Sequence, residues 1–173
     1  MNRAFIAVDF VNDFVDGALG SSNAREAAER ALDFLSKIQQ TEKIIFTLDT
    51  HPSGDKEFKL WGEHCLEGTP GSELWNGMNA IQGKRVRKGN YDAFFGTPLE
   101  QYLKDMQAQT LYIFGISTDI CVSSTVSGAF YRNFEIIVLE DLCASLRKED
   151  HYTALSSMSR LYGARIMNSK EVK

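Results

Sequence analysis

Apolar residues along the chain gather in short runs, and longer amphipathic stretches lie between them. The runs Ala4–Val8, Ile44–Leu48 and Leu111–Phe114 are almost wholly apolar, which is typical of strands buried on both faces of a parallel sheet. Between the first two runs, alanines and leucines recur at helical spacing and charged residues fill the other positions. This spacing predicts an amphipathic helix.

An alternation of strands and helices is the signature of a parallel sheet that is covered on both faces. We therefore expect a single-domain α/β protein over residues 1–173, with three α/β/α layers and a six-stranded, mostly parallel sheet. The predicted strands lie near residues 3–8, 43–48, 84–88, 110–115, 134–139 and 164–167, and the predicted helices near 23–40, 97–107, 119–132 and 148–162, with a shorter one around 72–78.

The segment from Thr50 to Gly83 is irregular and much longer than a usual connection in an α/β fold. Long loops in compact domains generally carry function. We expect this segment to cover a site.

Composition narrows the class of protein. The hydrophobic fraction of 43% is ordinary for a globular chain, and the net charge of −4 gives no reason to expect a nucleic acid or an anionic membrane as partner. No apolar segment is long enough to span a bilayer, and Met1-Asn2-Arg3 leads directly into a predicted strand, so we expect no signal peptide. Three cysteines without a C-x-x-C pair favour a reducing compartment, and we expect a cytoplasmic protein.

Cys121 is the first candidate for chemistry, because it lies just beyond an apolar run where a helix is expected to open. Free N–H groups and the positive end of the helix dipole would lower the pKa of a thiol there and favour the thiolate. A small buried cysteine inside a helix is the alternative, and it is the commoner fate of a free cysteine.

Two other features strengthen the catalytic interpretation. Asp9 directly follows the first predicted strand, so its carboxylate should point into the crevice where open α/β sheets bind ligands. The strand near 84–88 would bring one of several cations to the same edge, where a lysine could stabilise a thiolate and a carboxylate could carry its proton. The available cations are Lys84, Arg85, Arg87 and Lys88.

Asp9, Lys88 and Cys121, in this order and context, resemble the Asp-Lys-Cys triad of the isochorismatase-like cysteine hydrolases, and the match extends over residues 4–139. Within that superfamily, Asp49-Thr50-His51 and the segment Trp61–Gly71 are similar to nicotinamidases, which also hydrolyse pyrazinamide. One departure is Val11, which stands where many relatives carry glutamine. Another is the linker before His64, which lacks the extra histidine of some nicotinamidases.

A metal site is expected in the long segment. Asp49 and His51 are two residues apart at the end of a strand and should project to one side. His64 would complete a set of one carboxylate and two imidazoles, which suits zinc first and iron or manganese as alternatives. The resemblance adds Glu57 as a fourth ligand, seven residues before His64. An isolated D-x-H would more often be a turn, and His151 is expected to be a surface residue of the last helix.

The resemblance implies hydrolysis of nicotinamide to nicotinate and ammonia in NAD salvage, through a thioester at Cys121. Lys88 would hold the thiolate by its charge, and Asp9 would carry the proton to the departing ammonia. Backbone N–H groups of Ser117 and Cys121 would hold the oxyanion.

The resemblance also implies a cis peptide bond between Ile116 and Ser117. Phe14 and Trp61 would be the aromatic walls around the pyridine ring, although core packing is nearly as good an explanation for Phe14. The expected partners are a small carboxamide substrate and further copies of the chain in a homo-oligomer.

Other functions remain open at this point. A metal-independent hydrolase of the same superfamily, acting on another amide or a vinyl ether, would keep the triad but would not need His51 and His64. A flavodoxin-like ligand-binding protein is compatible with the strand order, yet acidic residues instead of phosphate-binding donors follow the first strand. A redox-sensing thiol protein would need Cys65 or Cys143 close to Cys121.

Overall fold

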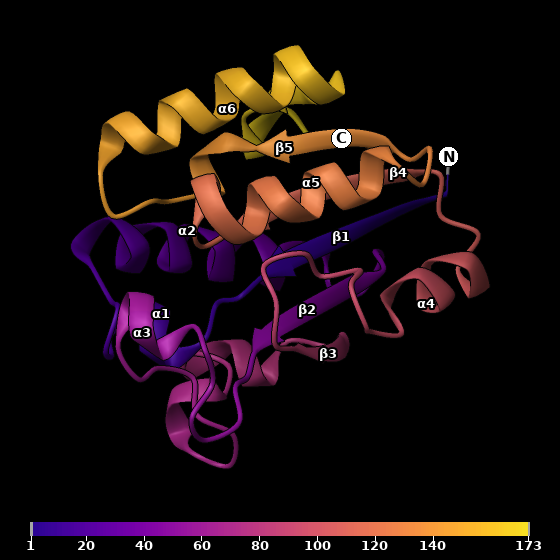
Figure 1. Cartoon of the computed structure of the whole chain (residues 1–173). Helices are drawn as coiled ribbons and strands as arrows, with labels where there is room; N and C mark the ends of the chain where they lie inside the picture. Colours follow the sequence, from indigo (N-terminus) through magenta and orange to yellow (C-terminus); the bar gives the residue numbers. More distant parts are fainter. Residues whose placement is uncertain (1, 173) are drawn as a thin grey trace.

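A computed structural model describes residues 2–172 and contains a sheet of six parallel strands in the order β3-β2-β1-β4-β5-β6 (Figure 1). The predicted α/β architecture and all six predicted strands are confirmed, and the sheet is parallel throughout. The strands are β1 (Arg3–Val8), β2 (Ile44–Asp49), β3 (Lys84–Lys88), β4 (Thr110–Gly115), β5 (Glu135–Leu139) and β6 (Arg165–Met167).

The three central strands form the core of the sheet. β1 lies between β2 and β4, and every residue of β2 and β4 is buried. Strands covered on both faces cannot alternate between apolar and polar residues, which explains their continuous apolar sequences. The edge strand β3 differs, because Val86 and Lys88 are buried whereas Lys84, Arg85 and Arg87 are exposed.

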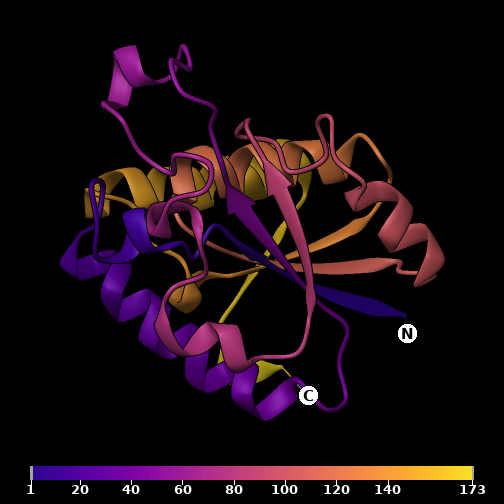
Figure 2. The ribbon, with the colours of Figure 1, turned by 90° about the horizontal axis from the view of Figure 1, so that it is seen from below.

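Helices cover both faces of the sheet. In Figure 2, α2 (Ser22–Ile38) lies on one face and α4 (Leu99–Asp105), α5 (Ser123–Phe130) and α6 (Lys148–Tyr162) lie on the other. Helix α2 begins where the Ser21 hydroxyl accepts a hydrogen bond of 3.1 Å from the N–H of Ala24. Its apolar side packs inward as its spacing predicted, with Ala24, Ala27, Ala28, Ala31 and Leu35 buried.

Some elements differ from the sequence-based expectation. The helix expected over 119–132 is divided into a π-helical turn, η3 (Thr118–Val122), and α5. The short helix expected around 72–78 is wrong, because this region holds two separate 3-10 turns, η1 (Pro70–Ser72) and η2 (Asn76–Ala80). The four-residue helices α1 (Asn12–Val15) and α3 (Phe58–Trp61) are too short to produce a periodic pattern. Two further 3-10 turns are η4 (Glu140–Leu142) and η5 (Ser169–Glu171).

The strand order reverses at β1, with β2 and β3 on one side and β4, β5 and β6 on the other. A crevice is therefore expected beyond the carboxyl end of β1. The helices α1 and α3 lie at this end of the sheet (Figure 1), and α3 belongs to the long segment between β2 and β3. Within residues 2–172, no helix is both long and apolar enough to cross a membrane.

Candidate active site

Asp9, Lys88 and Cys121 meet beyond the carboxyl ends of the strands. Lys88 Nζ lies 2.7 Å from Asp9 Oδ2 and 3.6 Å from Cys121 Sγ. Asp9 follows β1, Lys88 ends β3 and Cys121 belongs to the turn η3 after β4. Side chains alternate between buried and exposed at the end of β3, so Lys88 enters the site whereas the neighbouring Arg87 is exposed. The structure therefore brings together the three residues predicted from the sequence.

The Lys88 ammonium has more acceptors around it than protons to donate. Its Nζ also lies 2.8 Å from the carbonyl oxygen of Asn90 and 3.1 Å from Asp49 Oδ1. Three N–H donors thus face three oxygens and the sulfur of Cys121. Lys88 therefore acts on this sulfur mainly through its charge.

Asp9 is oriented by the neighbouring strand. The hydroxyl of Thr47 on β2 donates a hydrogen bond of 2.6 Å to Asp9 Oδ1, while Oδ2 faces Lys88. Complete burial raises the pKa of Asp9, and the charge of Lys88 opposes this effect. The result is a carboxylate that accepts a proton more readily than an ordinary aspartate.

The pKa of the Cys121 thiol does not follow the sequence-based prediction. Burial raises this pKa well above its usual value; Lys88 opposes the shift, and Asp9 and Asp49 add to it. The prediction of a lowered pKa is wrong, because complete burial beside two carboxylates outweighs the lysine. Cys121 rests as a thiol next to a proton acceptor.

Asp49, His51 and His64 form a second group of buried side chains. One potential ligand atom from each residue lies within 4.8 Å of the other two. Nε2 of His51 is 2.8 Å from Asp49 Oδ2, and Nε2 of His64 is 3.7 Å from the same oxygen. The predicted ligands are therefore close enough to hold one ion.

The partners of the imidazole Nδ1 atoms fit a metal site. His64 Nδ1 donates a hydrogen bond of 2.8 Å to the carbonyl oxygen of Gly62, which leaves a lone pair on Nε2. His51 Nδ1 lies 3.2 Å from Asp55 Oδ2, and its Nε2 faces Asp49 Oδ2, the oxygen that His64 Nε2 also faces. The hydrogen bond with Asp49 raises the pKa of His51 to about 9 against the effect of burial, so this place stabilises positive charge. The donor set suits zinc, iron or manganese.

Glu57 lies beside this group. Its side chain is only 8% exposed, and its Oε2 is 3.9 Å from Nε2 of His51. Burial raises its pKa. Glu57 is outside the set of donors that lie within 4.8 Å of one another, so its role as a fourth ligand stays a prediction.

Asp49 connects the two groups of residues. Its Oδ1 faces Lys88 and its Oδ2 faces the two histidines. The connection follows from the register of the sheet, in which Asp49 on β2 pairs with Lys88 on β3. The Asp49 carboxylate would therefore lie between an ion bound by the two histidines and Lys88 of the triad.

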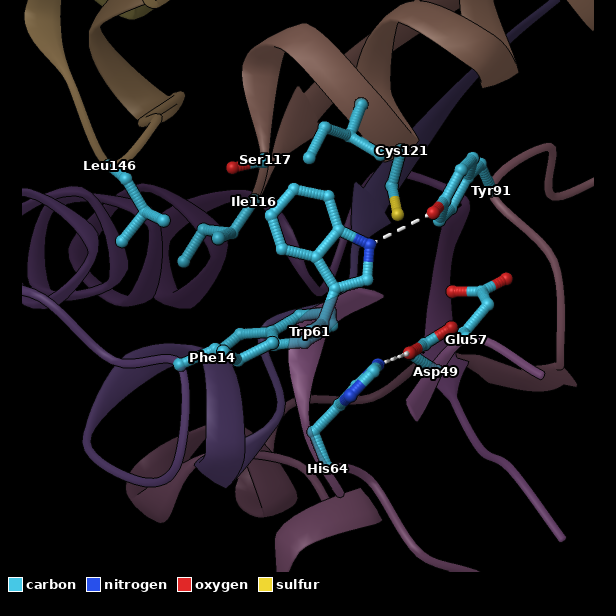
Figure 3. A pocket seen from close by; sticks show the side chains of 12 residues that line it. Phe14, Asp49, Glu57, Trp61, His64, Tyr91, Ile116, Ser117, Cys121 and Leu146 are labelled. Atoms are coloured by element: carbon cyan, nitrogen blue, oxygen red, sulfur yellow. Dashed lines mark hydrogen bonds and ion pairs between the residues drawn. The ribbon is translucent and has the colours of Figure 1, made fainter. Parts of the chain in front are cut away.

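A pocket joins the two groups (Figure 3). Both predicted wall residues, Phe14 and Trp61, line it, and the indole N–H of Trp61 donates a hydrogen bond of 3.0 Å to Tyr91 Oη. Five other lining residues could not be predicted, because single apolar or aromatic residues in loops form no pattern. They are Leu19, Tyr91, Ile116, Ile120 and Leu146.

Two more predictions can be compared with the structure. The peptide bond between Ile116 and Ser117 is cis, as the resemblance implied. His151 is not a simple surface residue, because it is half-buried and its Nδ1 lies 2.9 Å from Thr118 Oγ1. Cys65 and Cys143 are free and buried, and burial raises the pKa of both thiols.

Comparisons with known proteins agree with this geometry. A family model described as the isochorismatase domain matches residues 3–171. The chain is 30% identical to the nicotinamidase/pyrazinamidase of Mycobacterium tuberculosis, and the alignment covers 90% of this chain and 94% of that relative.

Solved structures of amidases share the fold of this chain. The N-carbamoylsarcosine amidase of Thermoplasma acidophilum is 30% identical with a TM-score of 0.89, and the alignment covers 100% of this chain and 99% of that protein. The pyrazinamidase of Pyrococcus horikoshii in complex with zinc is 27% identical with a TM-score of 0.89, covering 97% of this chain and 99% of that protein. The chain described here belongs to the isochorismatase family, within which it is an amidohydrolase.

Proposed function

We propose that this chain is a metal-dependent amidase that hydrolyses nicotinamide, and also pyrazinamide, to the ring carboxylate and ammonia. One observation carries the proposal: Cys121 lines the same pocket as Asp49 and His64, and Asp49 contacts Lys88 on one side and the two histidines on the other. The reaction would return nicotinamide to NAD synthesis. A cytoplasmic location and a homo-oligomer stay predictions from the sequence.

The first half of the reaction forms a thioester. The Cys121 thiol attacks the carboxamide carbon and gives its proton to Asp9, whose raised pKa suits it to this task. The C–N bond breaks and ammonia leaves with that proton, while the acyl group stays on Sγ. In the second half, Asp9 deprotonates a water molecule that cleaves the thioester, and the proton returns to the sulfur.

Lys88 stabilises the charge that develops on the sulfur. Burial alone would lower the pKa of Lys88, but the carboxylates of Asp9 and Asp49 raise it overall, so its side chain stays protonated. As the thiol proton moves to Asp9, the 3.6 Å contact between Nζ and Sγ becomes an interaction between opposite charges. Backbone N–H groups of Ser117 and Cys121 are the proposed donors to the oxyanion.

The remaining residues bind and orient the substrate. Asp49, His51 and His64 would hold a divalent ion, with Glu57 as a further ligand. When bound, such an ion supplies a Lewis-acid position for the ring nitrogen of the substrate. Phe14 and Trp61 would flank the ring and exclude water from the thiol.

Substrate selectivity tests this assignment. Benzamide has the same carboxamide and ring size as nicotinamide but lacks the ring nitrogen. We expect its kcat/KM to be lower by roughly a thousandfold, because a missing ligand contact and a misplaced carbonyl together cost several kcal/mol. The measurement is ammonia release from both amides by zinc-loaded protein. Comparable rates would contradict a role for the ring nitrogen.

A different amide substrate is the alternative, and the same assay addresses it. The similarity to an N-carbamoylsarcosine amidase supports testing N-carbamoylsarcosine beside nicotinamide. The buried Asp49, His51 and His64 favour nicotinamide, because they offer a site for a ring nitrogen. Rapid hydrolysis of N-carbamoylsarcosine with slow hydrolysis of nicotinamide would favour the alternative.

Removing one imidazole should separate substrate binding from thiol chemistry. We expect His51→Ala to lose the bound metal and nearly all nicotinamide turnover, because the site loses one of its two imidazole ligands and binds an ion much more weakly. Cys121 in this variant should still react with iodoacetamide, since Lys88 and Asp9 keep their contact. Metal content by atomic emission, turnover and alkylation are the three measurements.

Asp49→Asn serves as the contrasting variant. It should impair metal binding and also change Cys121 alkylation, because Asp49 contacts Lys88 as well as His51. Full nicotinamide turnover by metal-free His51→Ala would contradict the proposed role of the ligand set.

A further inference from the structure

The turn that carries Cys121 has a polar contact on a helix outside the pocket. Thr118, the first residue of η3, is fully buried, and its Oγ1 lies 2.9 Å from Nδ1 of His151 in the first turn of α6. Burial lowers the pKa of His151, so its imidazole is neutral near pH 7. A neutral imidazole and a hydroxyl can exchange donor and acceptor roles, so the contact holds with either tautomer.

The rest of this side of the turn is attached to the loop before α6. The N–H of Thr118 donates a hydrogen bond of 2.9 Å to the carbonyl oxygen of Ala144. The hydroxyl of Ser145 donates one of 2.5 Å to Asp119 Oδ1. Together with His151, these contacts fix the start of η3 against α6 and its preceding loop, and α6 also packs directly on η3.

Apolar packing alone does not support this region. An open cavity of about 450 Å³ lies next to it and is lined by Ala144, Ser145 and His151, together with residues of α2. A turn beside an open cavity can shift more easily than one enclosed by a dense core. The hydrogen bond between His151 and Thr118 therefore adds a restraint to the packing of α6 on η3.

We propose that His151 is a positioning residue that acts through Thr118 to hold the Thr118–Val122 turn, and with it the sulfur of Cys121, in the reactive geometry. The inference rests on the proposed function, in which Cys121 attacks the carboxamide. His151 does not line the substrate pocket, so its loss should affect the chemical step and leave substrate binding unchanged.

The test compares kcat, KM and the rate of Cys121 alkylation in four variants and one control. His151→Leu and Thr118→Val each remove one partner of the contact, and the double variant removes both. His151→Asn restores a hydrogen-bonding group, because the amide oxygen and nitrogen of Asn are the same number of bonds from Cα as Nδ1 of histidine. Thr153→Val is the control on the same helix, since Thr153 is exposed.

We expect His151→Leu and Thr118→Val each to lower kcat by roughly ten- to a hundredfold with KM nearly unchanged, because small displacements of a nucleophile are costly. The double variant should lose no more than the larger single loss, since both changes remove one interaction. His151→Asn should recover most of the rate, and Thr153→Val should match the wild type.

Alkylation of Cys121 by iodoacetamide should slow in the same variants, because Sγ moves away from Lys88. This measurement needs no substrate, so it tests the inference even if the wild type does not hydrolyse nicotinamide. Wild-type kcat and alkylation in His151→Leu, or losses that multiply in the double variant, would overturn the proposal. If His151→Leu folds poorly, Thr118→Val and His151→Asn decide by the same criteria.

Discussion

Replacing Cys121 with serine is expected to lower kcat for nicotinamide hydrolysis by about ten-thousandfold or more, as for other covalent nucleophiles. A serine hydroxyl is far more difficult to deprotonate than a thiol, and Asp9 is the only carboxylate proposed to accept the proton. Metal content and the unfolding temperature should stay close to those of the wild type, because serine is smaller by less than one methyl group. Ammonia release under single-turnover conditions measures the loss.

Cys143→Ser is the matched control for this substitution. The Cys143 sulfur donates to the carbonyl oxygen of Leu139, and a serine hydroxyl can keep this hydrogen bond. We expect nearly full activity in this variant. Limiting iodoacetamide should label Cys121 before Cys65 and Cys143, because only Cys121 combines access from the substrate pocket with a lysine beside the sulfur. Inactivation that follows the labelling of another cysteine would contradict the triad.

Lys88→Met should reduce both catalysis and stability. The substitution keeps the length of the side chain but leaves Asp9 and Asp49 buried without their cation. An uncompensated buried charge costs about 3–5 kcal/mol, and loss of the charge beside Sγ should lower kcat by roughly a thousandfold. Urea unfolding and ammonia release measure the two effects separately.

Two further variants show whether the position of the charge matters. Lys84→Met makes the same change at an exposed position on the same strand and should alter stability and kcat very little. Asp9→Asn combined with Lys88→Met removes one charge of each sign and should recover part of the stability but none of the activity. Recovery of activity in this double variant would show that Asp9 and Lys88 support folding only.

The features that follow from local pattern were predictable. The strand ends placed Asp9 and Cys121 at one edge of the sheet, because all carboxyl ends of a parallel sheet meet there. Once β3 is recognised as an edge strand, Lys88 is favoured over Arg87, because residues two apart share a face and Val86 marks the buried one. Asp49 and His51 project together because they are two residues apart at a strand end.

The features that depend on three-dimensional packing were not predictable. The contact between Asp49 and Lys88 depends on the register in which β2 and β3 pair. This register cannot be derived from the sequence of either strand alone. The pKa of Cys121 depends on burial by several elements at once. The helix start and the neighbouring lysine, taken alone, predicted a lowered pKa, whereas burial raises it. A single histidine on an amphipathic helix gave no indication that His151 contacts Thr118.

We propose that a metal held by Asp49, His51 and His64 orients a ring carboxamide for attack by Cys121. Titration of chelator-treated protein with zinc, followed by nicotinamide and benzamide hydrolysis at each step, tests this claim most directly. We predict that kcat/KM for nicotinamide rises in proportion to bound zinc up to one equivalent per chain, while the slow benzamide rate stays constant. Full nicotinamide turnover by the metal-free protein, or equal activation of both amides, would contradict the claim.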